Sequence, residues 1–347
     1  MEENQTSGND SISHFNDELC VNCQQNRFEP GKPINLCTDC RKSLIAYPIP
    51  KSIIYFAIAL AVIIGVSLVR TQRYVSAAIH LGKAENAIER KEFLTAQNEL
   101  LAVLNAFPDH MTANAYMMIA SAYNFDFEAY GVAYERIADK TTEDDELLQQ
   151  VNTASSYIAH NFPNDTVFYK KILAYPNDEQ KLIALADSTD ELPLKGQVAN
   201  RLYDLKAYSA AQAITDSILI VDPNFYQAIS MKSAIKRNLG KCKDALALCD
   251  RLLQFNSQDV YAISQKARIE LKCKNDKAAA QYADKAMNLS PYNPNAMEAK
   301  AMVEYFSGNK KQSLITLAQI KEQERKTGDS TVSTRLSPII NGLEVYR

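Results

Sequence analysis

The sequence predicts a mainly α protein whose larger part is an α-solenoid of stacked helical hairpins. Three observations lead to this prediction. Residue types recur every 34 positions in the second half of the chain, an uncharged run spans residues 53–69, and four cysteines precede that run. The uncharged run divides the 347 residues into a short head and a long tail, so we consider the three parts in turn.

The uncharged run, residues 53–69, predicts a transmembrane helix over residues 52–70. Its apolar side chains surround the helix on every side, which is typical of a helix in lipid or in a deep core. At about 1.5 Å per residue it reaches roughly 27 Å, close to the hydrocarbon thickness of a bilayer. Tyr47, Lys51, Arg70 and Tyr74 flank it, as expected of residues at the membrane interface. A buried helix of a soluble protein is the alternative. A cleaved signal peptide is disfavoured, because about 50 residues precede the run.

The head begins with a polar segment, residues 1–17, which we expect to be a disordered leader. Residues 18–48 then hold two pairs of cysteines, Cys20 with Cys23 and Cys37 with Cys40. Each C-x2-C turn places two thiolates on one side of a bend, so two such turns can surround one metal ion. This spacing predicts a structural Zn²⁺ site with four thiolate ligands. Two disulfides, or four ordinary thiols, are the alternatives.

Between the two cysteine pairs, residues 27–36 have the composition of two short strands around a Pro30–Gly31 turn. A C-x2-C turn, a hairpin and a second C-x2-C turn in this order resemble the zinc-ribbon family, and the likeness is confined to the head. The resemblance implies a small β element there. A head of this size buries little core, so metal binding would supply its folding free energy.

The charge balance argues against a nucleic-acid partner. Residues 1–52 hold 5 lysines and arginines against 7 acidic residues, and residues 70–347 hold 33 against 34. Neither part has the basic surface that binds a phosphate backbone.

The orientation in the membrane follows from the thiols, because the basic residues on the two sides of the run are equal in number. Thiolates that bind zinc need a reducing compartment. We therefore expect the head in the cytoplasm and the tail on the opposite side of the membrane, in the periplasm if the host is bacterial. Ala57, Ala61 and Gly65 share one face of the run and could support a homodimer, although chance explains the pattern equally well.

The tail carries the strongest pattern in the chain. Three sets of residues each recur at a constant step of 34 positions: Lys206, Gly240, Lys274 and Gly308; Ala211, Ala245, Ala279 and Ser313; Ile218, Leu252, Ala286 and Ile320. Pro223, Ser257 and Pro291 keep the same step. Small residues let the two helices of a hairpin pack closely, and a proline ends the second helix.

This pattern resembles the tetratricopeptide repeat (TPR) family. Tryptophan, which is common in the first helix of such repeats, is absent from the chain. The resemblance implies TPR-like repeats at 77–144 and four more at 192–327, separated by an irregular helical region at 145–191. Residues 328–347 are expected to form a C-terminal cap with a short helix.

In this family the first helices of the hairpins line a concave face that binds protein or peptide ligands. The resemblance therefore implies a partner-binding surface whose residues are aromatic, basic and polar. Its candidate residues are Arg237, Asn238, Tyr261, Arg268, Lys272, Glu298, Met302, Tyr305 and Phe306. A plain solvated face is the alternative.

Three further cysteines, Cys242, Cys249 and Cys273, lie inside the repeats. The favoured interpretation is that they are buried as small apolar side chains. A disulfide between Cys242 and Cys273 in an oxidising compartment is the alternative.

Enzymatic function is not expected. The two closest glycines, Gly328 and Gly342, are fourteen positions apart, so the usual phosphate-binding, dinucleotide and nucleophile-elbow motifs are absent from the sequence. The main hypothesis is a single-pass membrane-anchored scaffold with a structural zinc head. The alternative is a regulatory or sensor protein whose zinc head contacts a cytoplasmic partner or nucleic acid. An enzyme using carboxylates in 145–195 is a third, disfavoured hypothesis.

Overall fold

The computed structural model describes residues 18–45, 50–138, 140, 144–162, 166–328 and 330–347. They form two compact units, residues 1–72 and 73–347, and each unit is described by itself. The leader predicted at residues 1–17 lies outside the described residues.

The first unit contains the head, residues 18–45, and the larger part of one long helix. In the head, α1 (Thr38–Ile45) begins directly after Cys37 and contains Cys40, the last residue of the second cysteine pair. Its core is small and consists of Cys20, Leu36 and Cys37 with Cys23 and Cys40 packed against them. The small apolar core agrees with a fold that needs additional cross-linking.

The predicted β element of the head is wrong. Within the described residues no strand forms, and the head has only one isolated bridge, between Leu19 and Arg27. Two further backbone hydrogen bonds, from Phe28 to Glu18 and from Glu29 to Leu36, do not extend it into a ladder. Pro30 and Pro33 have no N–H to donate within the expected hairpin, which explains why pairing stops there.

The helix α2 (Lys51–Glu89) begins in the first unit and continues into the second. All residues from Lys51 to Ser76 are exposed, including the apolar residues from Ile53 to Val69. Among the described residues it is the one helix that is long and apolar enough to cross a membrane. The structure therefore gives this run no protein core in which to be buried.

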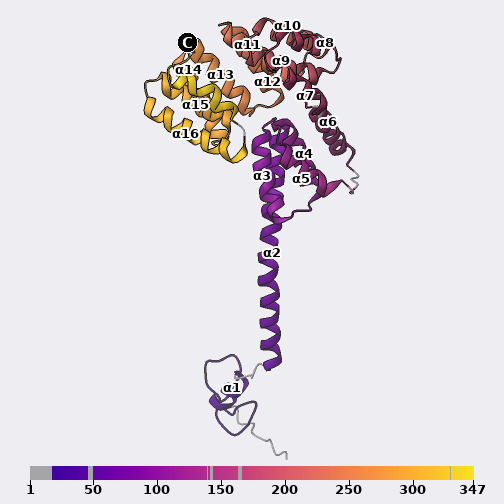
Figure 1. The fold of residues 1–347 in the computed structure, drawn as a ribbon. Helices are drawn as coiled ribbons and strands as arrows, with labels where there is room; N and C mark the ends of the chain where they lie inside the picture. Colours follow the sequence, from indigo (N-terminus) through magenta and orange to yellow (C-terminus); the bar gives the residue numbers. More distant parts are fainter. Residues whose placement is uncertain (1–17, 46–49, 139, 141–143, 163–165, 329) are drawn as a thin grey trace, which may run out of the picture. The chain divides into compact units, whose positions relative to one another are not determined.

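The second unit consists of helices joined by turns and loops, with no strand among its described residues, which confirms the mainly α prediction (Figure 1). Its helices after α2 are α3 (Phe93–Ala106), α4 (Met111–Asn124), α5 (Phe127–Ile137), α6 (Asp145–Asn161), α7 (Thr166–Ala174), α8 (Glu179–Asp187), α9 (Leu192–Asp204), α10 (Tyr208–Val221), α11 (Tyr226–Asn238), α12 (Cys242–Phe255), α13 (Val260–Lys272), α14 (Asp276–Leu289), α15 (Pro294–Phe306), α16 (Lys310–Thr327) and α17 (Thr331–Ile340).

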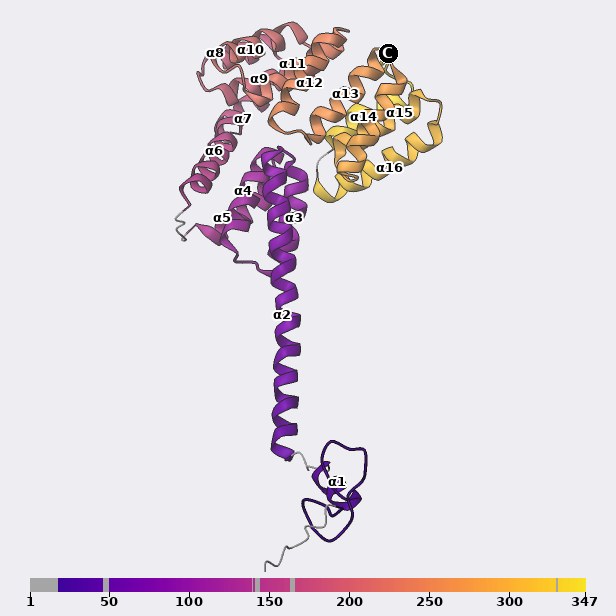
Figure 2. The same cartoon turned by 180° about the vertical axis from the view of Figure 1, so that it is seen from behind.

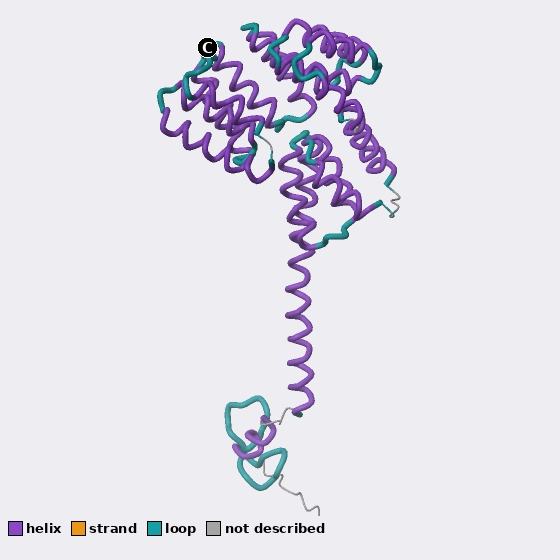
Figure 3. The backbone as a smooth tube through the Cα atoms, viewed as in Figure 1, coloured by secondary structure: helices purple, strands orange, loops and turns teal. Residues whose placement is uncertain are grey.

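Four helix pairs follow one another from α9 to α16, and we call residues 192–327 the C-terminal array. Consecutive helices pack as antiparallel neighbours, and α13 to α16 lie side by side when seen from the front and from behind (Figures 1 and 2). The small residues of the repeating pattern are fully buried at Ala211, Ala245, Ala279 and Ser313. The helix pairs and the short loops that join them are seen most easily in the backbone trace (Figure 3).

The turn inside each hairpin explains the Lys/Gly position of the pattern. Lys206, Gly240, Lys274 and Gly308 all have positive φ, between 62° and 87°. This left-handed conformation ends the first helix and reverses the chain after one or two residues. Lys91 and Phe125, separated by the same step as the later turns, have φ of 58° and 57° and mark the same turn in the earlier hairpins. The hairpins from α2 to α5 therefore share the turn geometry of the C-terminal array.

The irregular region between the hairpins consists of α6, α7 and α8. Phe168 and Ile172 of α7 and Leu182 of α8 join the core that α9 and α10 form. On α6, the ring of Tyr157 lies 4.9 Å from Tyr123 and 5.8 Å from Phe125, measured between centroids. The Phe125 ring also lies 4.6 Å from that of Tyr226 in α11, so aromatic packing connects the early hairpins to the C-terminal array.

The chain after the C-terminal array forms one helix and then a non-helical segment. Leu336, Ile339 and Ile340 of α17 are buried against α15 and α16. The helix ends at Ile340, and residues 341–347, which we call the strap, continue without regular structure. The predicted cap therefore consists of a helix and a non-helical segment.

Candidate functional site

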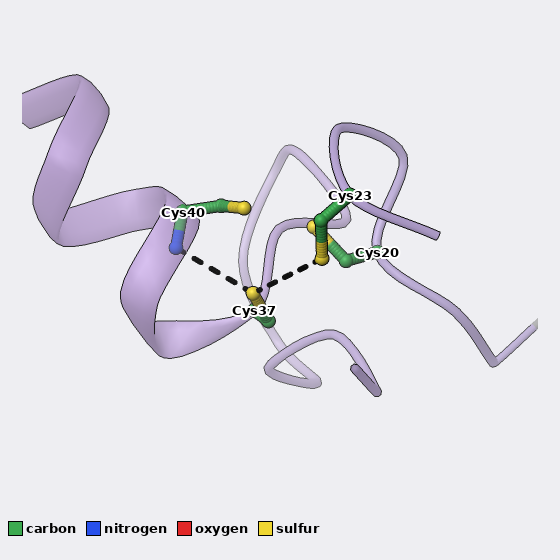
Figure 4. A group of neighbouring side chains, drawn as sticks. All are labelled: Cys20, Cys23, Cys37 and Cys40. Atoms are coloured by element: carbon green, nitrogen blue, oxygen red, sulfur yellow. Dashed lines mark hydrogen bonds between the residues drawn. The ribbon is translucent and has the colours of Figure 1, made fainter. Parts of the chain in front are cut away.

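The four head cysteines lie together. Their sulfur atoms are all within 4.8 Å of one another, and the Sγ atoms of Cys23 and Cys37 are 3.7 Å apart (Figure 4). Cys20, Cys23 and Cys37 come from loops, whereas Cys40 lies in the first turn of α1. The backbone reverses after Cys20, where the N–H of Gln24 donates to the Cys20 carbonyl. This turn helps to bring the two cysteine pairs, which are distant in sequence, to one place.

Hydrogen bonds to sulfur set the protonation of this cluster. Burial alone would raise the pKa of Cys20, but backbone N–H groups of Cys37, Cys23 and Asn22 outweigh it and lower the pKa to about 6. The N–H groups of Gln25 and Asn26 lower the pKa of Cys23. At Cys40 the Asn22 amide favours the thiolate, but the neighbouring sulfurs outweigh it and raise the pKa to about 12. Hydrogen bonds with the neighbouring sulfurs and burial thus keep Cys40 protonated, and a cation bound among the sulfurs would favour its thiolate form.

These residues fit a zinc ion. A tetrahedral site with Zn–S bonds of about 2.3 Å requires sulfurs roughly 3.8 Å apart, close to the Cys23–Cys37 distance of 3.7 Å. The backbone N–H groups directed at Cys20 and Cys23 are the outer-sphere donors that stabilise thiolate ligands. All four positions are cysteine, so the donor set suits a structural site with no open coordination position.

The predicted partner residues lie on the first helices of the C-terminal array. Arg237 and Asn238 belong to α11, Tyr261, Arg268 and Lys272 to α13, and the remaining four to α15. We call the surface made by these helices the inner face. Asn238, Tyr261, Lys272, Tyr305 and Phe306 are partly exposed on it.

The other four predicted residues, Arg237, Arg268, Glu298 and Met302, are buried. Each has at most 5% of its surface exposed, so none offers a contact surface by itself. They form the layer beneath the inner face and hold the exposed residues in place.

An ion-pair network forms the centre of this buried layer. Glu298, which is 2% exposed, contacts Arg268 of α13 and accepts two hydrogen bonds from Arg335 of α17, at 2.8 and 2.6 Å. Burial alone would raise the pKa of Glu298, but the two guanidinium groups outweigh it and lower the pKa to about 2. Nε and Nη2 of Arg268 are buried and have no hydrogen-bond partner among the described residues. Glu298 is therefore the single carboxylate shared by two cations.

A second network connects successive first helices. The Tyr203 hydroxyl of α9 accepts hydrogen bonds from Arg237 at 2.7 Å and from Asn238 at 2.9 Å. Arg237 also donates to Gln265, whose amide donates to the Tyr261 hydroxyl at 2.7 Å. The chain of donors and acceptors runs across α9, α11 and α13 and fixes their relative rotation.

Sequence reasoning missed Tyr203, Gln265, Arg335 and Tyr346 at this surface. Tyr203 precedes Arg237 by one full step of the repeat and lies in the same phase of the pattern, so the period could have found it. Arg335 and Tyr346 follow the last repeat and have no position in the period. Their contacts could not be found from the spacing of residue types.

The favoured interpretation of Cys242 and Cys273 as separate buried side chains is wrong. The two residues form a disulfide, with a Cα–Cα distance of 6.4 Å. Cys242 begins α12 and Cys273 follows α13, so the hairpin turns of adjacent repeats bring them together. Cys249 remains a free, fully buried thiol in the same cluster.

A cavity of about 690 Å³ lies among the early hairpins and α6. Four carboxylates, Glu85, Glu89, Asp144 and Glu146, line it together with Tyr116. The Tyr116 hydroxyl donates to Glu85 at 3.1 Å, and burial, followed by Glu85, raises the Tyr116 pKa to about 12. The acids come from two helices and one loop, and only Glu146 belongs to the 145–195 region proposed for an enzyme.

Comparison with known proteins gives structural matches only. No protein-family model matches the chain, and no curated protein matches it. A tetratricopeptide repeat protein from Parabacteroides merdae matches 78% of this chain and 94% of its own, with 12% identity and a TM-score of 0.35. YrrB, described as a TPR protein with an unusual peptide-binding site, matches 64% of this chain and 90% of its own, with 14% identity and a TM-score of 0.30. The TPR2AB domain of yeast Sti1, solved as a complex with pHSP90, matches 76% and 97%, with 11% identity and a TM-score of 0.30. At TM-scores of this size the likeness is weak, and the helical-repeat fold rests on the chain's own helix pairs.

Proposed function

We propose that the protein is a single-pass membrane-anchored scaffold whose helical hairpins recruit a protein or peptide partner. The observation that carries this proposal is the inner face. It offers partly exposed Tyr, Phe, Lys and Asn side chains above a buried polar layer that holds them rigidly. Aromatic residues held on a rigid surface are typical of protein-binding sites.

The anchor in this proposal is α2. A continuous run of exposed apolar residues from Ile53 to Val69 exceeds what a water-soluble surface tolerates. Insertion into a lipid bilayer removes this surface from water. Ala57, Ala61 and Gly65 are exposed on the same helix and remain a proposed contact for a homodimer.

The orientation in this proposal rests on two kinds of cysteine. The four head cysteines are free thiols, as a zinc site in a reducing compartment requires, whereas Cys242 and Cys273 are joined. Structural disulfides persist in oxidising compartments. We therefore assign the head, with one structural zinc ion, to the cytoplasm and the array to the opposite side.

Partner capture with variants of the full-length chain tests the scaffold function. The doubly substituted chain Lys272→Ala/Tyr305→Ala should lose most of a partner that co-purifies from detergent-solubilised membranes. The control Tyr292→Ala/Leu314→Ala removes two exposed side chains, 79% and 50% exposed, outside the inner face and should retain that partner. Equal capture by both variants would contradict the proposal.

A further inference from the structure

The strap lies against the inner face and makes its main contacts with its last two residues. The Tyr346 hydroxyl donates to the Arg268 carbonyl at 2.7 Å, and the Tyr346 carbonyl accepts a hydrogen bond from Lys272. The Phe306 ring centroid is 6.0 Å from that of Tyr346. Three first-helix residues thus contact one strap side chain and its backbone, and the end of the chain lies beside α13 and α14 in both views (Figures 1 and 2).

Arg347, the residue after Tyr346, adds contacts made by a positively charged group. Its guanidinium group lies over the Phe306 ring, 4.6 Å from the centroid, and donates to the Phe306 carbonyl at 3.3 Å. It also pairs with Asp276 in the first turn of α14. The site therefore holds a tyrosine side chain followed by a cation.

The apolar side chains in the middle of the strap do not pack against the protein, although the N–H groups of Leu343 and Glu344 donate to the Pro338 carbonyl at 2.8 and 3.0 Å. Leu343 is 81% exposed and Val345 is 87% exposed, although both are apolar. Glu344 makes one exposed ion pair, 3.1 Å long, with Lys206 in the α9–α10 turn. Tyr346 also packs against the core of the last hairpins, so the strap is held mainly at its end. A segment whose other side chains are free of core packing can detach without unfolding the helices behind it.

We propose that the strap is an intramolecular ligand that closes the inner face, and that the partner is a peptide segment presenting Tyr followed by Arg or Lys, which displaces it. This inference rests on the proposed scaffold function and identifies its ligand. The residues that contact Tyr346 and Arg347 include Arg268, Lys272 and Phe306, which belong to the predicted partner surface. Burial, and then Arg237, lower the pKa of Lys272, in agreement with a site that a ligand already shields from water.

A synthetic peptide with the sequence of residues 341–347, labelled at its N-terminus, serves as the probe. It is titrated against three full-length chains in detergent: the native sequence, Tyr346→Ala/Arg347→Ala, and the control Leu343→Ala/Val345→Ala. The first variant removes the contacts of the strap, whereas the control changes only its exposed side chains. A fourth chain, ending after Gly342, removes the strap altogether, and thermal unfolding verifies that each chain is folded.

We expect the peptide to bind Tyr346→Ala/Arg347→Ala and the shortened chain at least tenfold more tightly than the native chain and the control. A Kd of about 100 μM for the open site, with an effective strap concentration of about 1 mM, gives a difference of this size. A peptide with Ala in place of Tyr should bind the open chains at least tenfold more weakly. Asp276→Arg should weaken binding of the native peptide and favour one that ends in Glu.

Equal affinity for open and native chains, or no binding to a folded open chain, would overturn the inference. A concentration-dependent dimer of the native chain that Tyr346→Ala abolishes would also overturn it, because the strap of a second copy would then be the ligand. Failure of the scaffold function gives a different result. In that case the peptide binds the open chains, but no partner is lost from Lys272→Ala/Tyr305→Ala.

Discussion

At the scale of single residues, Glu298 is the carboxylate that joins two cations beneath the inner face. It is buried together with Arg268, and it also accepts both hydrogen bonds from Arg335. Removing one partner of a buried ion pair leaves charge in a low-dielectric site without compensation. The same residue therefore determines the stability of α13, α15 and α17 and the position of the exposed side chains above them.

Glu298→Gln should lower the free energy of unfolding of the second unit by about 3 to 5 kcal/mol, because two guanidinium groups lose their carboxylate. Urea unfolding, followed by circular dichroism, measures the change. Glu322→Gln is the control, since Glu322 forms exposed ion pairs with Arg325 and Lys326 on α16. A variant as stable as the control would show that the network contributes nothing.

The depressed pKa of Glu298 also predicts an acid effect. Its pKa is about 2 in the folded protein against an ordinary value of 4.5. The unfolded chain therefore binds this proton first, and the stabilisation present above pH 4.5 is lost as the pH falls toward 2. The lost contribution is on the order of 3 kcal/mol. Melting temperatures measured from neutral to strongly acidic pH should fall more steeply for the native chain than for Glu298→Gln, and parallel curves would contradict the shift.

At the scale of elements, the hairpins were predictable because their residues repeat. Lys206, Gly240, Lys274 and Gly308 adopt the same left-handed turn, and Ala211, Ala245 and Ala279 meet the same crowded helix contact. Because each hairpin imposes the same requirements at the same positions, residue types recur in the sequence with a constant period. The prediction of a β element in the head was wrong because Pro30 and Pro33 interrupt backbone pairing. The chain turns around the cysteine sulfurs instead of forming a ladder.

The inner face was predictable only in part. Arg268 and Glu298 could be placed on first helices from the period, but their burial depends on Arg335 and on Tyr346, which lie outside every repeat. Contacts between residues 37 and 78 positions apart have no counterpart in a local pattern. The tendency of cysteine to be buried as a small apolar side chain favoured separate cysteines at 242 and 273, whereas the hairpin turns bring their Cα atoms to 6.4 Å and the two form a disulfide.

The disulfide between the α12 and α13 ends should stabilise the C-terminal array. It closes a loop with a sequence separation of 31, which corresponds to about 3 to 4 kcal/mol in the chain-entropy model. Cys242→Ser should therefore melt at a lower temperature than the native chain. Reductant should lower the melting temperature of the native chain and leave that of Cys242→Ser unchanged. If reductant leaves the melting temperature of both chains unchanged, the disulfide does not contribute to the stability of the array.

In the head, metal should replace the missing core. Purified chain should contain one zinc ion per molecule by mass spectrometry, and Cys37→Ser should lose it. Cys249→Ser changes a buried thiol of the array and should retain the metal. A strong chelator should expose amide hydrogens of residues 18–45 to exchange, because the apolar core there is only Leu36 and the cysteines. Native chain without bound metal that keeps these amides protected would contradict the zinc assignment.

At the scale of the whole molecule, the proposal places the head, residues 18–45, and the second unit on opposite sides of one bilayer. Residues 53–69 are uncharged and exposed along their whole length, the thiols before them are free, and two cysteines after them are joined. Each observation concerns a different part of the chain, and a membrane with one reducing and one oxidising side accounts for all of them.

Protease protection in sealed right-side-out vesicles, with an epitope at each end of the full-length chain, tests this assignment most directly. We expect external protease to remove the C-terminal epitope and leave a protected fragment that contains the head and α2. The N-terminal epitope should disappear only after detergent is added. Loss of both epitopes from the same side, or release of the intact chain by an alkaline wash, would contradict the proposal of a membrane-spanning scaffold.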